Sequence, residues 1–350
     1  MSEFKLTTVE EFEAATARLL ETGAKVGADS WQMRVKNQTP HCKFGEQGVC
    51  CRICSMGPCR ITPKAPRGIC GCDVHGIVGR NFLRFTAGGA ATHSDHGREI
   101  CITLGHAKEG GDYQVKDPEK LIRIAKEWGV ETEGKDIYDL AHEMSDLAQE
   151  EYGKIRGYSR WLKRAPQHTQ DLWHAAGIEP RAIDREVSCA LHMTHMGNTS
   201  KPEALIRQAL RNGLSDGWGG SMCGTEFSDV LFGTPKPIDT EANLGVMNAE
   251  NVNIVVHGHD PSLSEMICEY ADSKEMIDYA KSMGAKGITV SGVCCTSNEV
   301  AMRRGIPMAG NFLQQENVVL TGACEAIVVD VQCIFPALGP LSKCFHTKFI

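Results

Sequence analysis

Seven of the 16 cysteines in this 350-residue chain lie within one short segment near its N-terminal end. They follow the pattern Cys42-x7-Cys50-Cys51-x2-Cys54-x4-Cys59-x10-Cys70-x-Cys72. Helices and strands do not need thiols at this density, whereas each iron atom of an iron–sulfur cluster needs a thiolate ligand. The segment therefore predicts electron transfer, carried by a loop in which several cysteines converge.

The composition limits the class of protein. The chain is 42% hydrophobic and 23% charged, and its formal charge of -7 argues against a nucleic-acid partner. No uncharged stretch approaches the roughly 18 residues of a membrane span. The acidic N-terminus has no apolar core and is not expected to be a signal peptide. Metal-bound thiols in a reducing cytoplasm therefore explain the cysteines better than disulfides in a secreted protein.

The cysteine segment is basic, although the chain as a whole is acidic. Residues 39–84 contain seven Lys and Arg residues against two acidic residues. One interpretation is a solvated basic face. The interpretation that we favour is that these cations compensate the negative charge of thiolate-bound clusters.

Two domains are predicted, the first of them mostly helical. Residues 1–240 should form a helical iron–sulfur domain, with residues 39–84 as its cluster-binding loop. Ile137, Leu140, Met144 and Leu147 recur at helical spacing and are expected to face its core.

The second predicted domain, residues 241–350, alternates strands and helices. Short β-branched runs at 253–257, 287–291 and 326–331 alternate with segments in which Ser262 and Thr296 are expected to cap helices. This alternation predicts a parallel, Rossmann-like α/β sheet. No G-x-G-x-x-G motif follows the first run, so a nicotinamide cofactor is not indicated.

Metal-ligand residue types follow each of the three predicted strands. His257 and His259 follow the first strand, Cys294 and Cys295 the second, and Cys333 the third. Ligands bind at the carboxyl ends of strands in open α/β sheets. One His and two Cys there can converge on a soft or borderline metal such as nickel, iron or zinc. Taken singly, each residue is as well explained by a structural role.

The pair His93 and His96 has a spacing that places both imidazoles on one helical face. Such a pair can bind a metal, relay protons or cap a buried polar network. A structural role explains the pattern equally well.

Together these motifs resemble the anaerobic nickel–iron carbon monoxide dehydrogenases. The resemblance covers the chain from about residue 40 to its end. The matching stretches are Cys42-x7-Cys50-Cys51-Arg-Ile-Cys54-x-Met-Gly-Pro-Cys59-Arg-Ile, Gly68-Ile-Cys70-Gly, His93-Ser-Asp-His96-Gly-Arg98, Asp216-Gly-Trp-Gly-Gly-Ser221, His257-Gly-His259, Gly292-Val-Cys-Cys295-Thr, Asp330-Val-Gln-Cys333 and His346-Thr-Lys348.

For the cysteine segment, the resemblance implies two clusters. Cys42 and Cys50 match a pair that, with the same pair from a second subunit, holds an Fe–S cluster shared across a homodimer interface. Cys72 matches no ligand and is expected to be structural. The ligands of an intrasubunit [4Fe-4S] cluster are matched by Cys51, Cys54, Cys59 and Cys70.

For the strand ends, the resemblance implies a catalytic Ni-Fe-S cluster. His259, Cys295 and Cys333 match three of its ligands. His259 is preferred to His257 because its spacing to Cys295 fits better, and Cys294 is expected to be a neighbour of the cluster.

The resemblance also implies a proton path. His93 and His96 match the start of a histidine ladder through which protons leave. Glu99 stands where many members have a further His, so the path is expected to continue in altered form.

The implied reaction is the reversible oxidation of CO with water to CO2, with electrons leaving through [4Fe-4S] clusters to a ferredoxin-like acceptor. An acetyl-CoA synthase or a nickel-insertion protein are further candidate partners. Because family members are much longer, the chain is expected to be a fragment or truncated product whose α/β domain is incomplete at its C-terminal side. Two alternatives are a truncated, non-catalytic electron-transfer module and a hybrid-cluster-type (hydroxylamine) reductase, against which the adjacent Cys50 and Cys51 argue.

Overall fold

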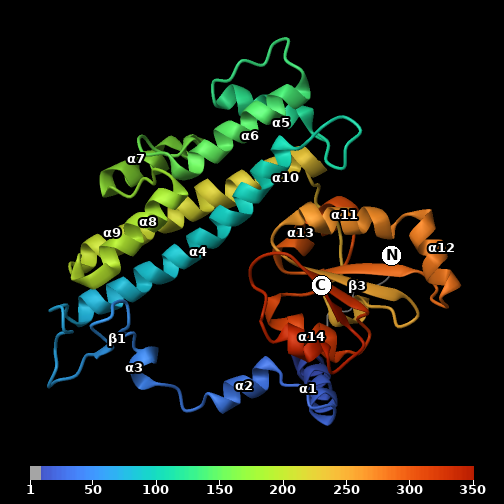
Figure 1. Cartoon of the computed structure of the whole chain (residues 1–350), viewed down its shortest axis with the longest axis horizontal. Helices are drawn as coiled ribbons and strands as arrows, with labels where there is room; N and C mark the ends of the chain where they lie inside the picture. The colour runs from blue at the N-terminus through green and yellow to red at the C-terminus, as the bar shows by residue number, and fades with distance from the viewer. Residues whose placement is uncertain (1–8) are drawn as a thin grey trace. The chain divides into compact units, whose positions relative to one another are not determined.

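The computed structural model describes residues 9–350, so residues 1–8 of the predicted helical domain lie outside the described residues. The chain divides into two units (Figure 1). Residues 40–234 form one, called here the helical unit. Residues 235–350 form the other together with residues 9–39, and this is called here the α/β unit.

The predicted boundary at residue 240 placed the N-terminal helices in the helical domain. In the structure these helices, α1 (Val9–Lys25) and α2 (Trp31–Asn37), belong to the α/β unit. Leu19 and Leu20 of α1 pack against the core of the α/β unit. The backbone N–H of Trp31 donates a hydrogen bond of 2.6 Å to the buried carboxylate of Glu316. These long-range contacts are not visible in local sequence patterns.

The helical unit is built around the long helix α4 (Val74–Gly105). Asp73 caps it by accepting a 2.9 Å hydrogen bond from the backbone N–H of Gly76. None of the helices between residues 9 and 350 is both long and apolar enough to cross a bilayer. The other elements of the unit are α3 (Lys43–Glu46), α5 (Pro118–Glu127), α6 (Ile137–Gly153), η1 (Arg160–Arg164), α7 (Gln167–Ala176), α8 (Ile183–Thr194), η2 (His195–Gly197), α9 (Pro202–Ser215), the π-helical turn η3 (Asp216–Ser221), α10 (Met222–Phe232) and the short strands β1 (Cys50–Cys51) and β2 (Cys59–Arg60).

The core of the helical unit lies between α4, α6 and α10. Leu140 and Met144 are buried, and Ile137 and Leu147 pack against the same core, so the predicted apolar face of α6 is confirmed. Close approach of helices depends on glycine, because a Cβ at Gly97 would lie 2.1 Å from the Tyr152 hydroxyl and 2.8 Å from the Gly220 carbonyl oxygen.

The α/β unit contains a parallel sheet whose described strands follow the order β5-β4-β3-β6-β7. The first of these strands, β3, lies at the centre, and the chain builds outward on one side before it crosses to the other. This is the doubly wound order of Rossmann-type sheets, so the predicted fold class is confirmed. The strands are β3 (Val252–Gly258), β4 (Ile288–Val293), β5 (Met308–Gly310), β6 (Ala326–Val329) and β7 (Lys348–Phe349).

Helices cover both faces of this sheet (Figure 1). Val255 faces one core, shared with α14, and Val256 faces the other, shared with α11 and α13, because successive residues of a strand point to opposite sides. Burial on both faces explains why the strands are continuous apolar runs. The remaining elements are η4 (Leu244–Val246), α11 (Pro261–Ala271), α12 (Lys274–Ser282), α13 (Cys294–Arg304), η5 (Phe312–Gln314), α14 (Gln315–Leu320) and α15 (Leu338–Ser342).

Two predicted helix starts in this unit are wrong by a few residues. Asp260, not Ser262, caps α11, and its side chain accepts a 2.8 Å hydrogen bond from the Ser262 N–H. Helix α13 starts at Cys294, and Thr296 lies inside it, buried, with its hydroxyl 2.8 Å from Ser264. Helix α11 has a proline in its first turn, which favours a helix start at that point. Strand β4 runs directly into α13, so this helix has already begun before Thr296.

Candidate metal centres

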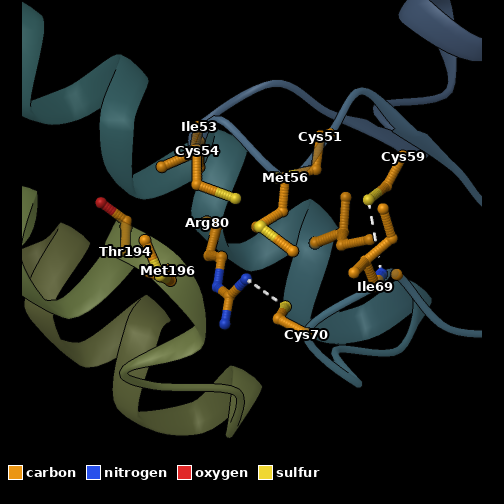
Figure 2. A pocket seen from close by; sticks show the side chains of 13 residues that line it. Cys51, Ile53, Cys54, Met56, Cys59, Ile69, Cys70, Arg80, Thr194 and Met196 are labelled. Atoms are coloured by element: carbon orange, nitrogen blue, oxygen red, sulfur yellow. Dashed lines mark hydrogen bonds between the residues drawn. The ribbon is translucent and has the colours of Figure 1, made fainter.

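The cysteine loop forms one pocket in the helical unit. Strands β1 and β2 pair antiparallel and place Cys51 opposite Cys59. Residues from three parts of the loop line the pocket, and Arg80, Thr194 and Met196 close it from the helices (Figure 2). Its cysteine side chains are those of Cys51, Cys54, Cys59 and Cys70.

Hydrogen bonds hold the loop around this pocket. The Ile69 N–H donates to Cys59 Sγ at 3.4 Å, and the Gly68 N–H donates to the Cys72 carbonyl at 2.8 Å. Cys72 is buried beside Cys51, away from the pocket lining, and burial raises the pKa of its thiol. This placement agrees with the structural role expected for Cys72.

Cys42 and Cys50 lie outside the pocket lining. Cys42 is exposed at the start of α3, where the backbone N–H groups of Gly45 and Phe44 lower the pKa of its thiol. The Cys50 carbonyl accepts a 2.9 Å hydrogen bond from the Asn81 side chain, which fixes this part of the loop to α4. The two thiols are therefore separate from the four that line the pocket.

The basic surplus of the segment divides into two kinds of cation. Arg52, Arg60 and Arg67 are exposed, as a solvated face requires. Arg80 is only 2% exposed, and its guanidinium Nη1 lies 3.6 Å from Cys70 Sγ, where it lowers the pKa of the Cys70 thiol. Arg80 therefore compensates a thiolate through a direct contact, whereas the exposed Arg60 lowers the pKa of the Cys42 thiol only through its charge.

The histidine pair lies in the middle of α4. His93 Nδ1 hydrogen-bonds the Asp216 carboxylate at the start of the π-helical turn. His96 is 5% exposed, and burial, with a smaller contribution from His93, lowers its pKa to about 4. His96 is therefore neutral near pH 7, and a pKa this low makes it a weak proton acceptor at that pH. Glu99 is exposed on the same helix.

The strand-end residues gather at the carboxyl edge of the sheet, where β3 lies between β4 and β6. Cys295 and Cys333 are exposed there. Burial, together with the nearby thiols of Cys333 and Cys295, raises the pKa of the Cys294 thiol to about 12. The Cys294 thiol also hydrogen-bonds Cys333. His259 follows β3 and is 6% exposed. The two cysteine segments therefore lie close together at this edge.

Backbone strain is concentrated at this edge. Cys294, Gln332 and Cys333 have φ values of 69°, 69° and 57°, a left-handed conformation that is uncommon outside glycine. Strain of this kind persists where the surrounding structure enforces it, and it clusters at functional sites.

Sequence reasoning missed two residues that organise this edge. Asp330 accepts hydrogen bonds from the backbone N–H groups of His259 and Asp260, the latter at 3.1 Å, and burial raises its pKa to about 6. A Cβ at Gly258, which has φ 144°, would lie 1.8 Å from the Asp330 carboxylate. The position of Asp330 directly after β6 was the available signal.

Gln315 is the other missed residue. Its amide oxygen lies 3.1 Å from His257 Nε2 and accepts a 2.7 Å bond from the Phe335 N–H, and its amide nitrogen donates to the Cys333 carbonyl at 2.9 Å. His257 is fully buried in this network. No pattern in the sequence marks a glutamine at the start of α14 as a partner of two strand ends.

Among the described residues, no group of three or more His, Cys, Asp or Glu side chains is arranged to hold a single metal ion. That geometry belongs to mononuclear sites, whereas the thiolates of a multi-iron cluster each bind a different iron. Four thiols around one pocket beside a buried guanidinium fit an anionic iron–sulfur cluster. Imidazole and thiols at one sheet edge fit soft or borderline metals.

Comparison with known proteins places these features in one family. The chain is 48% identical to carbon monoxide dehydrogenase 1 of Methanosarcina mazei over 97% of its own length and 55% of that protein. It is 45% identical to carbon monoxide dehydrogenase 1 of Carboxydothermus hydrogenoformans, covering 97% of this chain and 54% of the relative. The chain thus spans about half the length of these curated relatives.

A solved structure agrees with the sequence comparisons. The as-isolated, Ni-free carbon monoxide dehydrogenase from Thermococcus sp. AM4, produced without CooC maturase, matches with a TM-score of 0.91 and 48% identity, over 95% of this chain and 54% of that one. The sequence matches the Prismane/CO dehydrogenase family over residues 49–350, which include the pocket, the histidine pair and the strand ends. The chain therefore belongs to the Prismane/CO dehydrogenase family.

Proposed function

We propose that this chain serves in the reversible oxidation of CO by water, which yields CO2, two protons and two electrons. The observation that carries the proposal is the coexistence, in a chain of this family, of a four-cysteine pocket and a strained His/Cys sheet edge. The first arrangement suits electron transfer and the second suits a reactive metal centre.

The pocket cysteines are proposed to hold the intrasubunit [4Fe-4S] cluster. Support comes from their shared pocket and from the cation that faces it. Cys42 and Cys50 are proposed to hold half of a second cluster. Two thiolates cannot complete a four-iron cluster, so this second site calls for a homodimer.

The sheet edge is proposed to contribute His259, Cys295 and Cys333 to a Ni-Fe-S cluster. His259 is favoured over His257, because His257 is fully buried and engaged by Gln315. When bound, such a metal centre supplies Lewis acidity and a water of lowered pKa. The chain's own part is to fix the donors: Gln315 holds the Cys333 turn, and Asp330 holds the backbone at His259.

His93 and His96 are proposed to remove protons. His96 is neutral near pH 7 and its lowered pKa means that it would pass a proton on rather than hold it, and Asp216 can orient the His93 ring and stabilise it once protonated. Electrons are proposed to pass to a ferredoxin-like acceptor in the cytoplasm. An acetyl-CoA synthase and a nickel-insertion protein are further proposed partners, with CO and CO2 as the small-molecule substrates.

A non-catalytic electron-transfer module is the second candidate. The observation that favours it is that this chain contributes four cysteines to the pocket but one imidazole and two thiols to the proposed catalytic centre. The pocket can therefore be complete where the catalytic centre is not.

Metal analysis of the anaerobically produced chain separates the two candidates. Nickel bound in constant ratio to protein, together with CO-dependent dye reduction, supports the dehydrogenase. Iron without nickel and without CO-dependent reduction supports the module. Cys295→Ala should remove nickel and leave iron in the pocket, while Cys344→Ala, a half-buried cysteine of the same unit, should keep both metals. Loss of pocket iron in Cys295→Ala would contradict the division into separate sites.

A further inference from the structure

Arg80 is a buried cation in an unusual setting. It lies in the second turn of α4 with 2% of its surface exposed. Its Nε and Nη2 donate to the Thr199 carbonyl at 3.1 and 2.9 Å, and its Nη1 points to Cys70 Sγ at 3.6 Å. Among the described residues no carboxylate lies within ion-pair distance of Arg80. A buried charge without a counter-charge is costly, so this environment calls for an anion.

The direction of the side chain shows where that anion would lie. The Thr199 carbonyl holds one edge of the guanidinium, which leaves Nη1 directed into the four-cysteine pocket (Figure 2). Arginine presents its donors in a rigid planar fork, so anchoring one edge fixes the other. The contact with Thr199 therefore fixes the direction in which Arg80 faces the pocket.

We propose that Arg80 is a positioning residue that raises the reduction potential of the cluster held in this pocket, through its charge and its hydrogen bond to Cys70 Sγ. This inference rests on the proposed function, because it takes the pocket to hold a [4Fe-4S] cluster. Four thiolates outweigh the positive charge of the iron–sulfur core, so the bound cluster is the anion that the buried guanidinium lacks.

The sign of the effect follows from charge. Reduction adds one electron to a cluster that is already negative, and sulfur becomes a better hydrogen-bond acceptor. A donor cation at Cys70 therefore stabilises the reduced form more than the oxidised form. Hydrogen bonds to sulfur and local net charge are established determinants of cluster potential.

Arg84 provides a matched control on the same helix. It lies one turn after Arg80, is half-buried, and donates to Thr194 Oγ1 at 2.7 Å, with no hydrogen bond to a cysteine. Arg84→Gln removes a nearby positive charge without removing a contact to a cluster ligand. It therefore separates the specific contact from the general effect of charge.

The test is an anaerobic redox titration of the iron-loaded chain, followed by the EPR signal of the reduced cluster. We expect Arg80→Gln to make one-electron reduction at least about tenfold less favourable, a shift of about 59 mV to more negative potential. Arg80→Lys keeps the charge and should shift the potential in the same direction by less. Arg84→Gln should stay close to the unsubstituted chain.

Each outcome has one meaning. Equal potentials in Arg80→Gln and the unsubstituted chain overturn the inference, as does an equal shift in Arg80→Gln and Arg84→Gln. If Arg80→Gln does not retain iron, Arg80→Lys decides, and an unchanged potential there overturns the inference. Absence of any [4Fe-4S] signal in the unsubstituted chain overturns the proposed cluster site itself, and is distinguishable from the other results.

Discussion

His96 should make the stability of the helical unit depend on pH. Its pKa is lowered from 6.5 to about 4, with burial as the main cause, so the unfolded chain binds a proton at this position more readily than the folded chain. Stability is then complete above pH 6.5 and is lost as the pH falls from 6.5 towards 4. The variant His96→Gln removes the titrating group and should remove this part of the pH dependence.

The magnitude follows from the two pKa values. At pH 5.5 the unfolded form is mostly protonated at this residue while the folded form is not, which favours unfolding by about 1.4 kcal/mol. At pH 7.5 neither form is protonated and the effect is close to zero. The loss of stability between pH 7.5 and pH 5.5 should therefore be smaller in His96→Gln by about 1.3 kcal/mol.

Urea unfolding followed by tryptophan fluorescence can measure this difference, since four of the five tryptophans, all except Trp31, lie in the helical unit. His142→Gln, which removes an exposed histidine of the same unit, is the control and should keep the pH dependence of the unsubstituted chain. Equal pH dependence in His96→Gln and the unsubstituted chain would refute the reasoning, because His96 would then titrate alike in both states.

Four further substitutions test the packing of the two units by their unfolding midpoints. Gly97→Ala should destabilise the helical unit by about 1–3 kcal/mol because its Cβ would meet neighbouring atoms, while Gly88→Ala, with nothing within 4 Å, should stabilise the same helix by about 0.4–1 kcal/mol. Lys120→Met should cost about 3–5 kcal/mol, because it leaves the buried Asp229 carboxylate without its cation. Gly258→Ala should destabilise the α/β unit, since the φ of 144° and the adjacent Asp330 carboxylate both exclude a side chain. An unfolding midpoint equal to that of the unsubstituted chain would show that the edge of the sheet can relax.

Much of the fold could be predicted because it is encoded locally. The three long strands and the apolar face of α6 follow from residue type and spacing alone. The strands β5 and β7 could not be found this way, because they contain three and two residues and exist only through pairing with a neighbour. The N-terminal helices were assigned to the wrong unit for the same reason, since only their distant contacts place them.

The candidate sites, like the fold, could be predicted from the sequence only in part. Cysteine spacing and strand ends pointed to the pocket and to the sheet edge. Arg80 and Gln315 act through side chains that reach across the fold, and no local pattern distinguishes them from other residues of their type. Asp330 was marked only by its position directly after β6. The left-handed conformation of Cys294 and Cys333 is likewise a property of tertiary packing.

The most direct test of the account is the iron content and reduced-state EPR spectrum of two neighbouring variants, Cys59→Ala and Cys72→Ala. Cys59 lines the pocket, whereas Cys72 belongs to the same sequence segment but is buried outside the lining. We expect Cys59→Ala to lose the signal and the iron of one [4Fe-4S] cluster and Cys72→Ala to retain both. Retention of the cluster in Cys59→Ala, or its loss in both variants, would contradict the assignment of the pocket.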